Sequence, residues 1–331
     1  MPRVCTFYPF LFAAALILGA AATACDAQGD DDAVEPGEVI EAGGPSVVTG
    51  TETKVRVPTG QLTITVGNPV SEVDPTETAD VTARSASSGD SLVGVVLEWD
   101  GGKSVPDWQE PLLPPGTIDP VVTVVAGNHR TEVDAPMLPL AAAYFVGVEG
   151  GAEPAIEIEF DGVTQTVDAT GKRDAGDAAG LYDEATAAAP AETRCDTERL
   201  EGGVTADMTC AWGVGAMAYV VDAGWAPHAG VWTVASIRSS YDSLTVTADG
   251  ESPSYTVTGV DDASTLAGKR ASGMVIRSDR TDGFDGALVF EPFISEADLE
   301  IVQRLDSAIR SGDSGPETKD FVFRRTVTVG G

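Results

Sequence analysis

The sequence predicts an all-β protein with two antiparallel β-sandwich domains in tandem. Short apolar or alternating runs follow one another, turn residues separate them, and helical periodicity is missing between them. Residues 61–66 alternate apolar and polar side chains, as a half-buried strand does. Residues 156–160 also alternate up to Asp161-Gly162, and 163–167 follow as a partner strand. This segment is the strongest hairpin signal in the chain.

Residues 1–25 have the pattern of a secretory signal peptide. Arg3 is the only charged side chain before Cys25, and residues 10–24 are apolar or small throughout. Their length falls short of the roughly 20 apolar residues that a membrane-spanning helix needs. Ala22-Thr23-Ala24-Cys25 resembles the lipobox of bacterial lipoproteins, whose cysteine is acylated after cleavage. The resemblance implies that 1–24 is removed, that Cys25 carries lipid, and that the protein is extracytoplasmic and anchored to the cell membrane.

Cysteine parity favours lipidation over the alternative, ordinary signal-peptidase cleavage after Ala24. That cleavage would leave Cys25, Cys195 and Cys210, an odd number of thiols in an oxidising space. Lipidation at Cys25 leaves one pair, and we expect a disulfide between Cys195 and Cys210. A bridge closing a loop of this size contributes about 3 kcal/mol to stability. A Cys-x-x-Cys motif is absent from the sequence, so the pair is predicted to be structural and not redox-active or metal-binding.

The chain is strongly acidic. It has 20 Lys and Arg against 52 Asp and Glu, and removal of Arg3 with the signal leaves 19 against 52, a net charge of −33. Such a surface repels phosphate groups, so nucleic acid is not an expected partner. A solvated surface explains the acids, and binding of calcium or of a cationic wall component is the sharper alternative. Seven acids and no base lie between Asp26 and Glu41, so we expect a disordered tether over 25–45.

The first sandwich domain is expected over 46–170. The nearly continuous apolar run 92–99 predicts a central core strand, and 121–125 and 142–148 are similar short runs. A Leu-Thr-Ile-Thr-Val strand, a polar spacer and a long Val-rich strand occur here in that order. This order resembles the immunoglobulin-like modules of actinobacterial lipoproteins of unknown function, and the resemblance covers 44–170. It implies an immunoglobulin-like fold for this domain.

The second sandwich domain is expected over 194–331, after an Ala- and Gly-rich linker at 171–193. Its predicted strands are 216–221, 231–237, 244–247, 255–258, 274–276, 287–290 and 321–329. By economy we expect it to be immunoglobulin-like as well, giving two tandem domains of that kind.

One amphipathic helix is predicted over 296–311, near the C-terminus of the second domain. Ser295-Glu296-Ala297-Asp298 is similar to a capping box, and Gly312 would end the helix. Apolar residues recur at helical spacing between these ends, namely Leu299, Val302, Leu305 and Ile309. The helix is expected to pack on one edge or end of the second sandwich.

Two patterns that could carry chemistry fit structural roles better. Asp279, Asp282 and Asp285 do not match the EF-hand spacing, and a hairpin turn rich in Asp and Gly explains them. Gly312-Asp313-Ser314-Gly315 is similar to the nucleophile segment of chymotrypsin-like proteases, but too little chain follows it to complete a barrel. The sequence has two histidines, which disfavours a histidine-based zinc site. We therefore predict no catalytic residue, no metal ligand and no cofactor.

The candidate binding residues are aromatic: Trp108, Trp212, Trp225 and Trp232. The last three surround the second cysteine of the predicted disulfide, which would hold their loop rigid and lower the entropy cost of binding. Trp108 lies in the proline-rich segment 105–120, which could also form a stiff binding loop. The alternative is that all four belong to the core. For Trp108 we favour it, with Leu112 and Leu113 closing the open end of the first sandwich.

These features together predict a lipid-anchored protein that binds or scaffolds at the cell envelope, without catalysis. The expected partners are the membrane, through the lipid, and an envelope protein or a cell-wall component. An envelope carbohydrate-active enzyme with paired carboxylates is the alternative from another class. A passive structural spacer is the third possibility.

Overall fold

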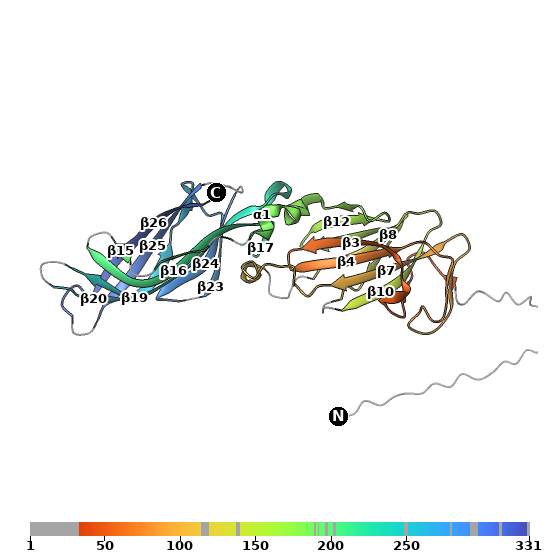
Figure 1. Ribbon diagram of the computed structural model, residues 1–331, viewed down its shortest axis with the longest axis horizontal. Helices are drawn as coiled ribbons and strands as arrows, with labels where there is room; N and C mark the ends of the chain where they lie inside the picture. Colours follow the sequence, from red (N-terminus) through yellow and green to blue (C-terminus); the bar gives the residue numbers. More distant parts are fainter. Residues whose placement is uncertain are drawn as a thin grey trace, which may run out of the picture.

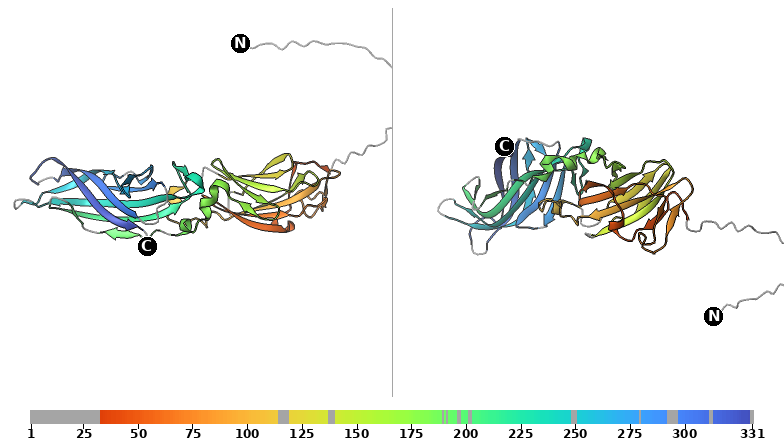
Figure 2. Two further views of the ribbon diagram at one scale, coloured as in Figure 1. Left: turned by 90° about the horizontal axis from the view of Figure 1, so that it is seen from above. Right: turned by 45° about the vertical axis from the view of Figure 1, so that its right-hand side comes forward.

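The protein is an elongated all-β molecule with two lobes placed end to end (Figures 1 and 2). The computed structural model describes residues 33–113, 119–136, 140–188, 190, 192–195, 198–200, 203–247, 251–278, 280–291, 297–310 and 313–329. We call residues 33–174 the first lobe and residues 193–329 the second lobe. The predicted signal peptide, Cys25 and the first part of the predicted tether lie outside the described residues. The prediction of an all-β fold is confirmed.

The first lobe is a sandwich of two antiparallel sheets. Over the described residues, the first sheet runs in the order β2 (Val39–Glu41), β10 (Ala141–Val148), β7 (Ser91–Trp99), β4 (Gly60–Gly67) and β3 (Gly50–Val57). The second sheet runs in the order β13 (Arg173–Asp174), β12 (Val163–Asp168), β11 (Ala155–Phe160), β8 (Val121–Ala126) and β9 (His129–Val133). Inward-facing residues of both sheets form one hydrophobic core. The predicted hairpin is confirmed as β11 and β12, with Asp161-Gly162 as its turn.

The central strand β7 is buried on both faces, which explains its continuous apolar sequence. Val93, Val95 and Leu97 face the sandwich core, and Leu92 and Val96 face a second, smaller cluster. A small sheet contributes to this second cluster, formed by β1 (Ala33–Val34), β6 (Arg84–Ala86) and β5 (Glu72–Val73). The 3₁₀ helix η1 (Pro45–Val47) borders it.

The predicted tether over 25–45 is wrong for residues 33–45. β1 pairs with β6, β2 pairs with β10, and Val34 and Ala42 are buried in the second cluster. The acidic side chains of this segment remain exposed at Glu35, Glu38 and Glu41. The acidic composition misled because backbone pairing with an existing sheet needs few apolar side chains.

The second lobe is built from one large sheet that curls around its own core. Over the described residues, its strands run in the order β14 (Thr193–Cys195), β16 (Val204–Met217), β19 (Trp232–Val246), β20 (Ser254–Asp262), β25 (Ala297–Ile309), β21 (Thr265–Leu266) and β22 (Lys269–Arg270). β15 (Glu198–Leu200) also pairs with β16, β24 (Gly283–Phe290) with β19, β23 (Gly273–Ser278) with β24, and β26 (Thr318–Val329) with β25.

The core of the second lobe lies inside this curl. β16, β19, β20, β24, β25 and β26 all send side chains into one cluster. The described strands of this lobe are connected in one sheet, so a second sandwich of two separate sheets is not confirmed. The immunoglobulin-like character of either lobe stays a prediction.

The predicted helix over 296–311 is wrong, because Ala297–Ile309 is strand β25. Alternate residues of β25 are buried on one face: Leu299, Ile301, Gln303, Leu305 and Ser307. The polar residues at 303 and 307 hide this period of two. The apolar residues at 299, 302, 305 and 309 imitate a helical face, since Val302 is also buried on the other side of the strand. The capping residues Ser295-Glu296 and Gly312 lie outside the described residues.

The predicted linker over 171–193 lies between the lobes, and much of it is ordered and packed. It contains β13, the 3₁₀ helix η3 (Gly176–Tyr182) and the short helix α1 (Glu184–Ala187), which lie between the lobes (Figure 1). Tyr182 donates a hydrogen bond to Gln165 Oε1 at 2.6 Å. Gly180 lies so close to the carbonyl oxygen of Gly230, in the second lobe, that a Cβ would come within 2.0 Å of it. Side chains other than hydrogen are therefore excluded at this contact.

The register of β25 gives a test of the strand assignment. Ile301 is off the predicted helical face but fully buried in the strand. Ile301→Ala should therefore lower the free energy of unfolding by about 2–5 kcal/mol. Arg304→Ala, at an exposed position of the same strand, is the control and should change it by less than about 0.5 kcal/mol. Equal small losses in both variants, measured by denaturant unfolding, would contradict the strand.

Candidate functional site

The most distinctive region of the described structure is the junction between the two lobes. The hydrophobic core of the first lobe continues into the base of the second lobe without interruption. The second-lobe members of this shared core are Met217, Tyr219, Val220, Ala226, Trp232, Val234, Val275, Ala287 and Val289. Burial on this scale resists relative motion of the lobes, because any hinge opening would expose apolar surface to water.

Three aromatic rings pack edge to face at the centre of the junction. Phe160, at the end of β11, lies 5.5 Å from Tyr219 and 6.2 Å from Trp225 between ring centroids, both at interplanar angles of 89°. Tyr219 and Trp225 are 5.4 Å apart. These two come from a small hairpin, β17 (Tyr219–Val220) and β18 (Gly224–Trp225). Such pairs contribute about 0.5–1.5 kcal/mol each beyond area burial.

Hydrogen bonds fix the rings in this arrangement. Trp225 Nε1 donates to the carbonyl oxygen of Phe160 at 3.0 Å, and the Tyr219 hydroxyl donates to Asp161 Oδ2 at 2.9 Å. Burial, first, and the hydrogen bond to the Asp161 carboxylate raise the pKa of Tyr219 to about 12. The phenol therefore remains a donor at neutral pH.

The proline-rich segment forms the second half of the junction. Leu112, in the 3₁₀ helix η2 (Glu110–Leu112), is buried in the shared core, and its carbonyl oxygen accepts from Val221 N at 2.9 Å. The Trp108 ring packs directly on Gly215 of β16, where a Cβ would come within 2.6 Å of the ring. The segment therefore closes the first sandwich against the second lobe. An exposed binding loop is not formed by its described residues.

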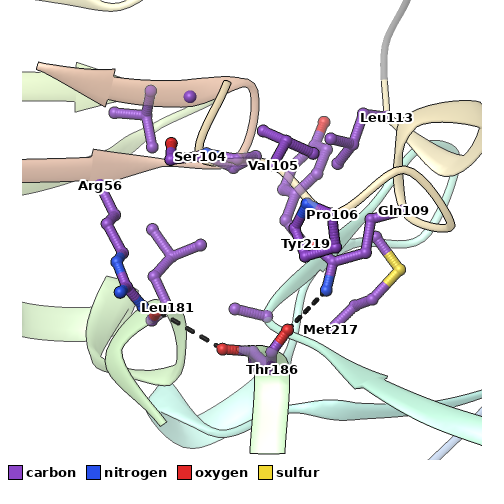
Figure 3. Close-up of a pocket in the computed structure, with 14 residues that line it drawn as sticks. Arg56, Ser104, Val105, Pro106, Gln109, Leu113, Leu181, Thr186, Met217 and Tyr219 are labelled. Atoms are coloured by element: carbon purple, nitrogen blue, oxygen red, sulfur yellow. Dashed lines mark hydrogen bonds between the residues drawn. The ribbon is translucent and has the colours of Figure 1, made fainter. Parts of the chain in front are cut away.

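A small pocket lies in the junction, with a volume of about 150 Å³. Its labelled lining comes from the end of β3, the segment 104–113, the η3–α1 segment, the end of β16 and the start of β17 (Figure 3). Gln109 Nε2 donates to the carbonyl oxygen of Thr186 at 2.7 Å, and Arg56 Nη1 donates to that of Leu181 at 3.1 Å. These two bonds tie the η3–α1 segment to the first lobe across the pocket.

The chemistry of this pocket is limited. Among the described residues that line it, Arg56 is the one charged residue, and none carries a carboxylate or an imidazole. Its volume lies below the roughly 300–1,000 Å³ of typical ligand sites. Paired carboxylates for glycan hydrolysis are not found in it. We therefore interpret the pocket as a packing gap between the two lobes and not as a substrate site.

The expectation of an exposed tryptophan surface is wrong for Trp212 and Trp232. Trp212 is 2% exposed and packs in the core of the second lobe, with the Arg325 guanidinium 4.9 Å from its ring centroid. Trp232 is 6% exposed, and its Nε1 donates to the Gly224 carbonyl oxygen at 3.0 Å. Trp225 and Trp108 are partly buried against the shared core. The four rings thus serve two different clusters and do not form one surface.

The structure brings Cys195 and Cys210 opposite each other. They are direct partners in the antiparallel pairing of β14 with β16. Directly opposed residues of such a pair have Cα atoms about 4.5–5.5 Å apart, within the range that a disulfide spans. The register therefore supports the disulfide, which stays a prediction.

The acidic turn considered for calcium is occupied by arginines. Asp282 pairs with Arg280 at 3.0 Å, and Asp285 pairs with Arg277 at 2.9 Å and with Arg238 at 3.6 Å. Asp279 lies outside the described residues. In the part of the chain that the structure describes, no group of three or more His, Cys, Asp or Glu residues is arranged to hold a metal ion. A helix long and apolar enough to span a membrane is likewise not found there.

A cluster of polar residues that lies inside the second lobe was not predicted from the sequence. Ser239, Tyr241, Asp262 and Gln303 lie together among apolar core residues. Only the arrangement of three strands, β19, β20 and β25, brings these residues together, and they are spread over 65 positions of the chain. The sequence signal that could have indicated this cluster is a polar residue at a position where strand alternation places a core residue. Such residues are found at 239 and 241 in β19 and at 303 in β25.

Comparisons with known proteins add little to this geometry. No protein-family model matches the chain, and no curated protein matches its sequence. A solved structure, described as a conserved domain protein from Bacillus anthracis, is 8% identical over 84% of this chain and 90% of that chain, with a TM-score of 0.19. A likeness this weak carries no argument about fold or function.

The raised pKa of Tyr219 predicts a pH dependence at the junction. The folded protein favours the protonated phenol, whereas an unfolded tyrosine ionises near pH 10. Stability should therefore fall as the pH rises from about 10 to about 12, since ionisation would place two negative charges together. Tyr219→Phe should lose about 1 kcal/mol at neutral pH and show a shallower alkaline loss than the wild type. Denaturant unfolding across this pH range measures both, and parallel alkaline losses would contradict the assignment.

Proposed function

We propose that the chain is an exported lipoprotein, anchored through Cys25, that binds or scaffolds at the outer side of the cell membrane. Its partner is an envelope protein or a cell-wall component, and its role is not catalytic. The single observation that carries this proposal is the shared core of the lobe junction. A rigid junction suits a protein that must hold one lobe at a set distance from its anchor.

The position of the N-terminal strands supports an orientation in which the first lobe lies next to the membrane. β1 and β2 belong to the end of the first lobe that lies away from the second lobe (Figures 1 and 2). An anchor at Cys25 precedes Ala33 by eight positions. It would therefore place the first lobe next to the membrane and the second lobe farther out.

The distribution of charge supports the same orientation. Residues 26–193 contain 7 basic and 31 acidic residues, a net charge of −24, whereas residues 194–331 contain 12 and 21, a net charge of −9. The more acidic part would face anionic lipid headgroups and be repelled by them, so the molecule would stand off the surface. The less acidic second lobe is better suited to meet an envelope partner.

Fluorescence quenching by labelled lipid tests this orientation. Dyes are placed at Val81→Cys or at Met274→Cys, exposed positions at 70% and 50% in the first and second lobe. Val81 belongs near the anchor, because the turn before it bonds to β2 through Ala79 N and the Glu41 carbonyl oxygen at 3.0 Å. Quenching should be strong at 81 and weak at 274, since quenching falls steeply with distance.

A Cys25→Ala variant provides the control for the anchor. It should incorporate no labelled palmitate, be released from the membrane, and lose quenching at both positions. Equal quenching at 81 and 274 in the anchored protein would contradict the upright orientation. Palmitate labelling of the Cys25→Ala protein would contradict the anchor itself.

A further inference from the structure

The polar cluster in the second lobe is organised around one glutamine side chain. Gln303 is fully buried on the inner face of β25. Its Oε1 accepts two hydrogen bonds from β19, one from the Ser239 hydroxyl at 2.9 Å and one from the Tyr241 hydroxyl at 2.6 Å. Its Nε2 donates to Asp262 Oδ2 at 3.3 Å. The amide thus has hydroxyls at its oxygen and a carboxyl group at its nitrogen.

The two hydroxyls have different surroundings. The Tyr241 phenol donates a short hydrogen bond, and burial raises its pKa, so it remains a proton donor to the carbonyl oxygen. A donor in this position stabilises negative charge that develops on the oxygen during attack at the carbon. The Ser239 oxygen itself accepts from Phe284 N at 3.3 Å, which holds it beside the amide. Serine is the smaller and more flexible nucleophile of the two.

Asp262 is placed to protonate the nitrogen. Ser264 fixes the carboxyl group through its backbone N at 3.0 Å and its hydroxyl at 3.1 Å. Burial is the main cause that raises the pKa of Asp262, with the neighbouring charge of Asp261 adding to it. A buried carboxyl group that is more readily protonated is suited to act as a general acid towards a leaving amine.

We propose that Ser239 and Gln303 react to form an ester bond between β19 and β25. Ser239 Oγ bonds to the side-chain carbonyl carbon of Gln303, the bond from that carbon to Nε2 breaks, and ammonia leaves. The serine proton passes along its hydrogen bond to Gln303 Oε1 as the new bond forms, and Asp262 gives its proton to the departing nitrogen. As the carbonyl re-forms, Oε1 releases its proton and the Asp262 carboxylate takes it up. Tyr241 stabilises the oxygen in the tetrahedral intermediate. The reaction needs no oxidant, reductant or cofactor, and its products are the ester and ammonia.

A second buried glutamine shows what the cluster adds. Gln165 Oε1 accepts from the Tyr182 hydroxyl at 2.6 Å, much as Gln303 accepts from Tyr241. Its Nε2, however, donates to the backbone carbonyl oxygen of Arg56 at 2.7 Å. Neither a serine hydroxyl nor a carboxyl group is among the recorded partners of its side chain. Gln165 is therefore the natural internal control and should stay an amide.

The ester bond would stabilise the second lobe by linking two of its strands covalently within the core. β19 and β25 are not neighbours in the sheet, because β20 lies between them. The ester would therefore link two strands that are otherwise connected only through β20 and through packing in the core. The two residues are 64 positions apart, and the covalent link would close that whole stretch. The inference is independent of the proposed envelope function, since it concerns the chemistry of the folded lobe alone.

Mass analysis of a digest tests the proposal on the purified full-length protein. The peptides that contain Ser239 and Gln303 should be found joined, with a combined mass lower by one ammonia. Hydroxylamine, which cleaves esters, should separate them. The Gln165 peptide should keep its unmodified mass. Separate peptides with an intact Gln303 amide in the folded wild-type protein would overturn the proposal.

Three variants assign the roles. Ser239→Ala should abolish the joined peptide, and Asp262→Asn should slow its formation by roughly 100-fold or more while keeping an acceptor for Ser264. Ser307→Ala removes a different buried serine, which lies on β25, and should leave the joined peptide unchanged. Circular dichroism checks that each variant folds. A joined peptide that persists in folded Ser239→Ala, or that forms at the wild-type rate in folded Asp262→Asn, would contradict the assigned chemistry.

Discussion

The structure depends on the insertion of a small aromatic hairpin of the second lobe into the end of the first. Tyr219 and Trp225 pack edge to face on Phe160, and each makes a hydrogen bond to the turn or strand end that Phe160 belongs to. The first sandwich has no closed end of its own at this place, because its core continues into the second lobe. The two lobes are therefore stabilised together, and neither has a separate interior at the junction.

This constraint explains why the connecting segments are ordered. A connection between lobes that moved freely would need no fixed structure. The η3–α1 segment, however, is hydrogen-bonded to the first lobe, and Gly180 of η3 packs closely against Gly230 of the second lobe. The small pocket beside them is lined by residues that bond across it, and it has no arrangement of acids or bases that suits catalysis. The order of these segments follows from the shared core, which holds the two lobes against each other.

The sequence predicted strands well and the connections between them poorly. Runs such as 92–99 and 156–167 are read correctly because period and turn residues are local signals. The false helix over 296–311 arose where two polar core residues, Gln303 and Ser307, broke the alternation. Residues 33–45 were misjudged as a tether because their order comes from partners far away in the chain. Trp212 and Trp232 were misjudged for the same reason, since burial depends on tertiary packing that one sequence does not display.

A distance measurement between the lobes tests the central claim that they move as one body. Spin labels at Val121→Cys and Met274→Cys, both exposed, should give one narrow distance distribution. Trp225→Ala, which removes a ring from the junction, should broaden it. Val257→Ala removes buried volume from the second lobe alone and should leave it narrow. A broad distribution in the wild-type protein would contradict the account.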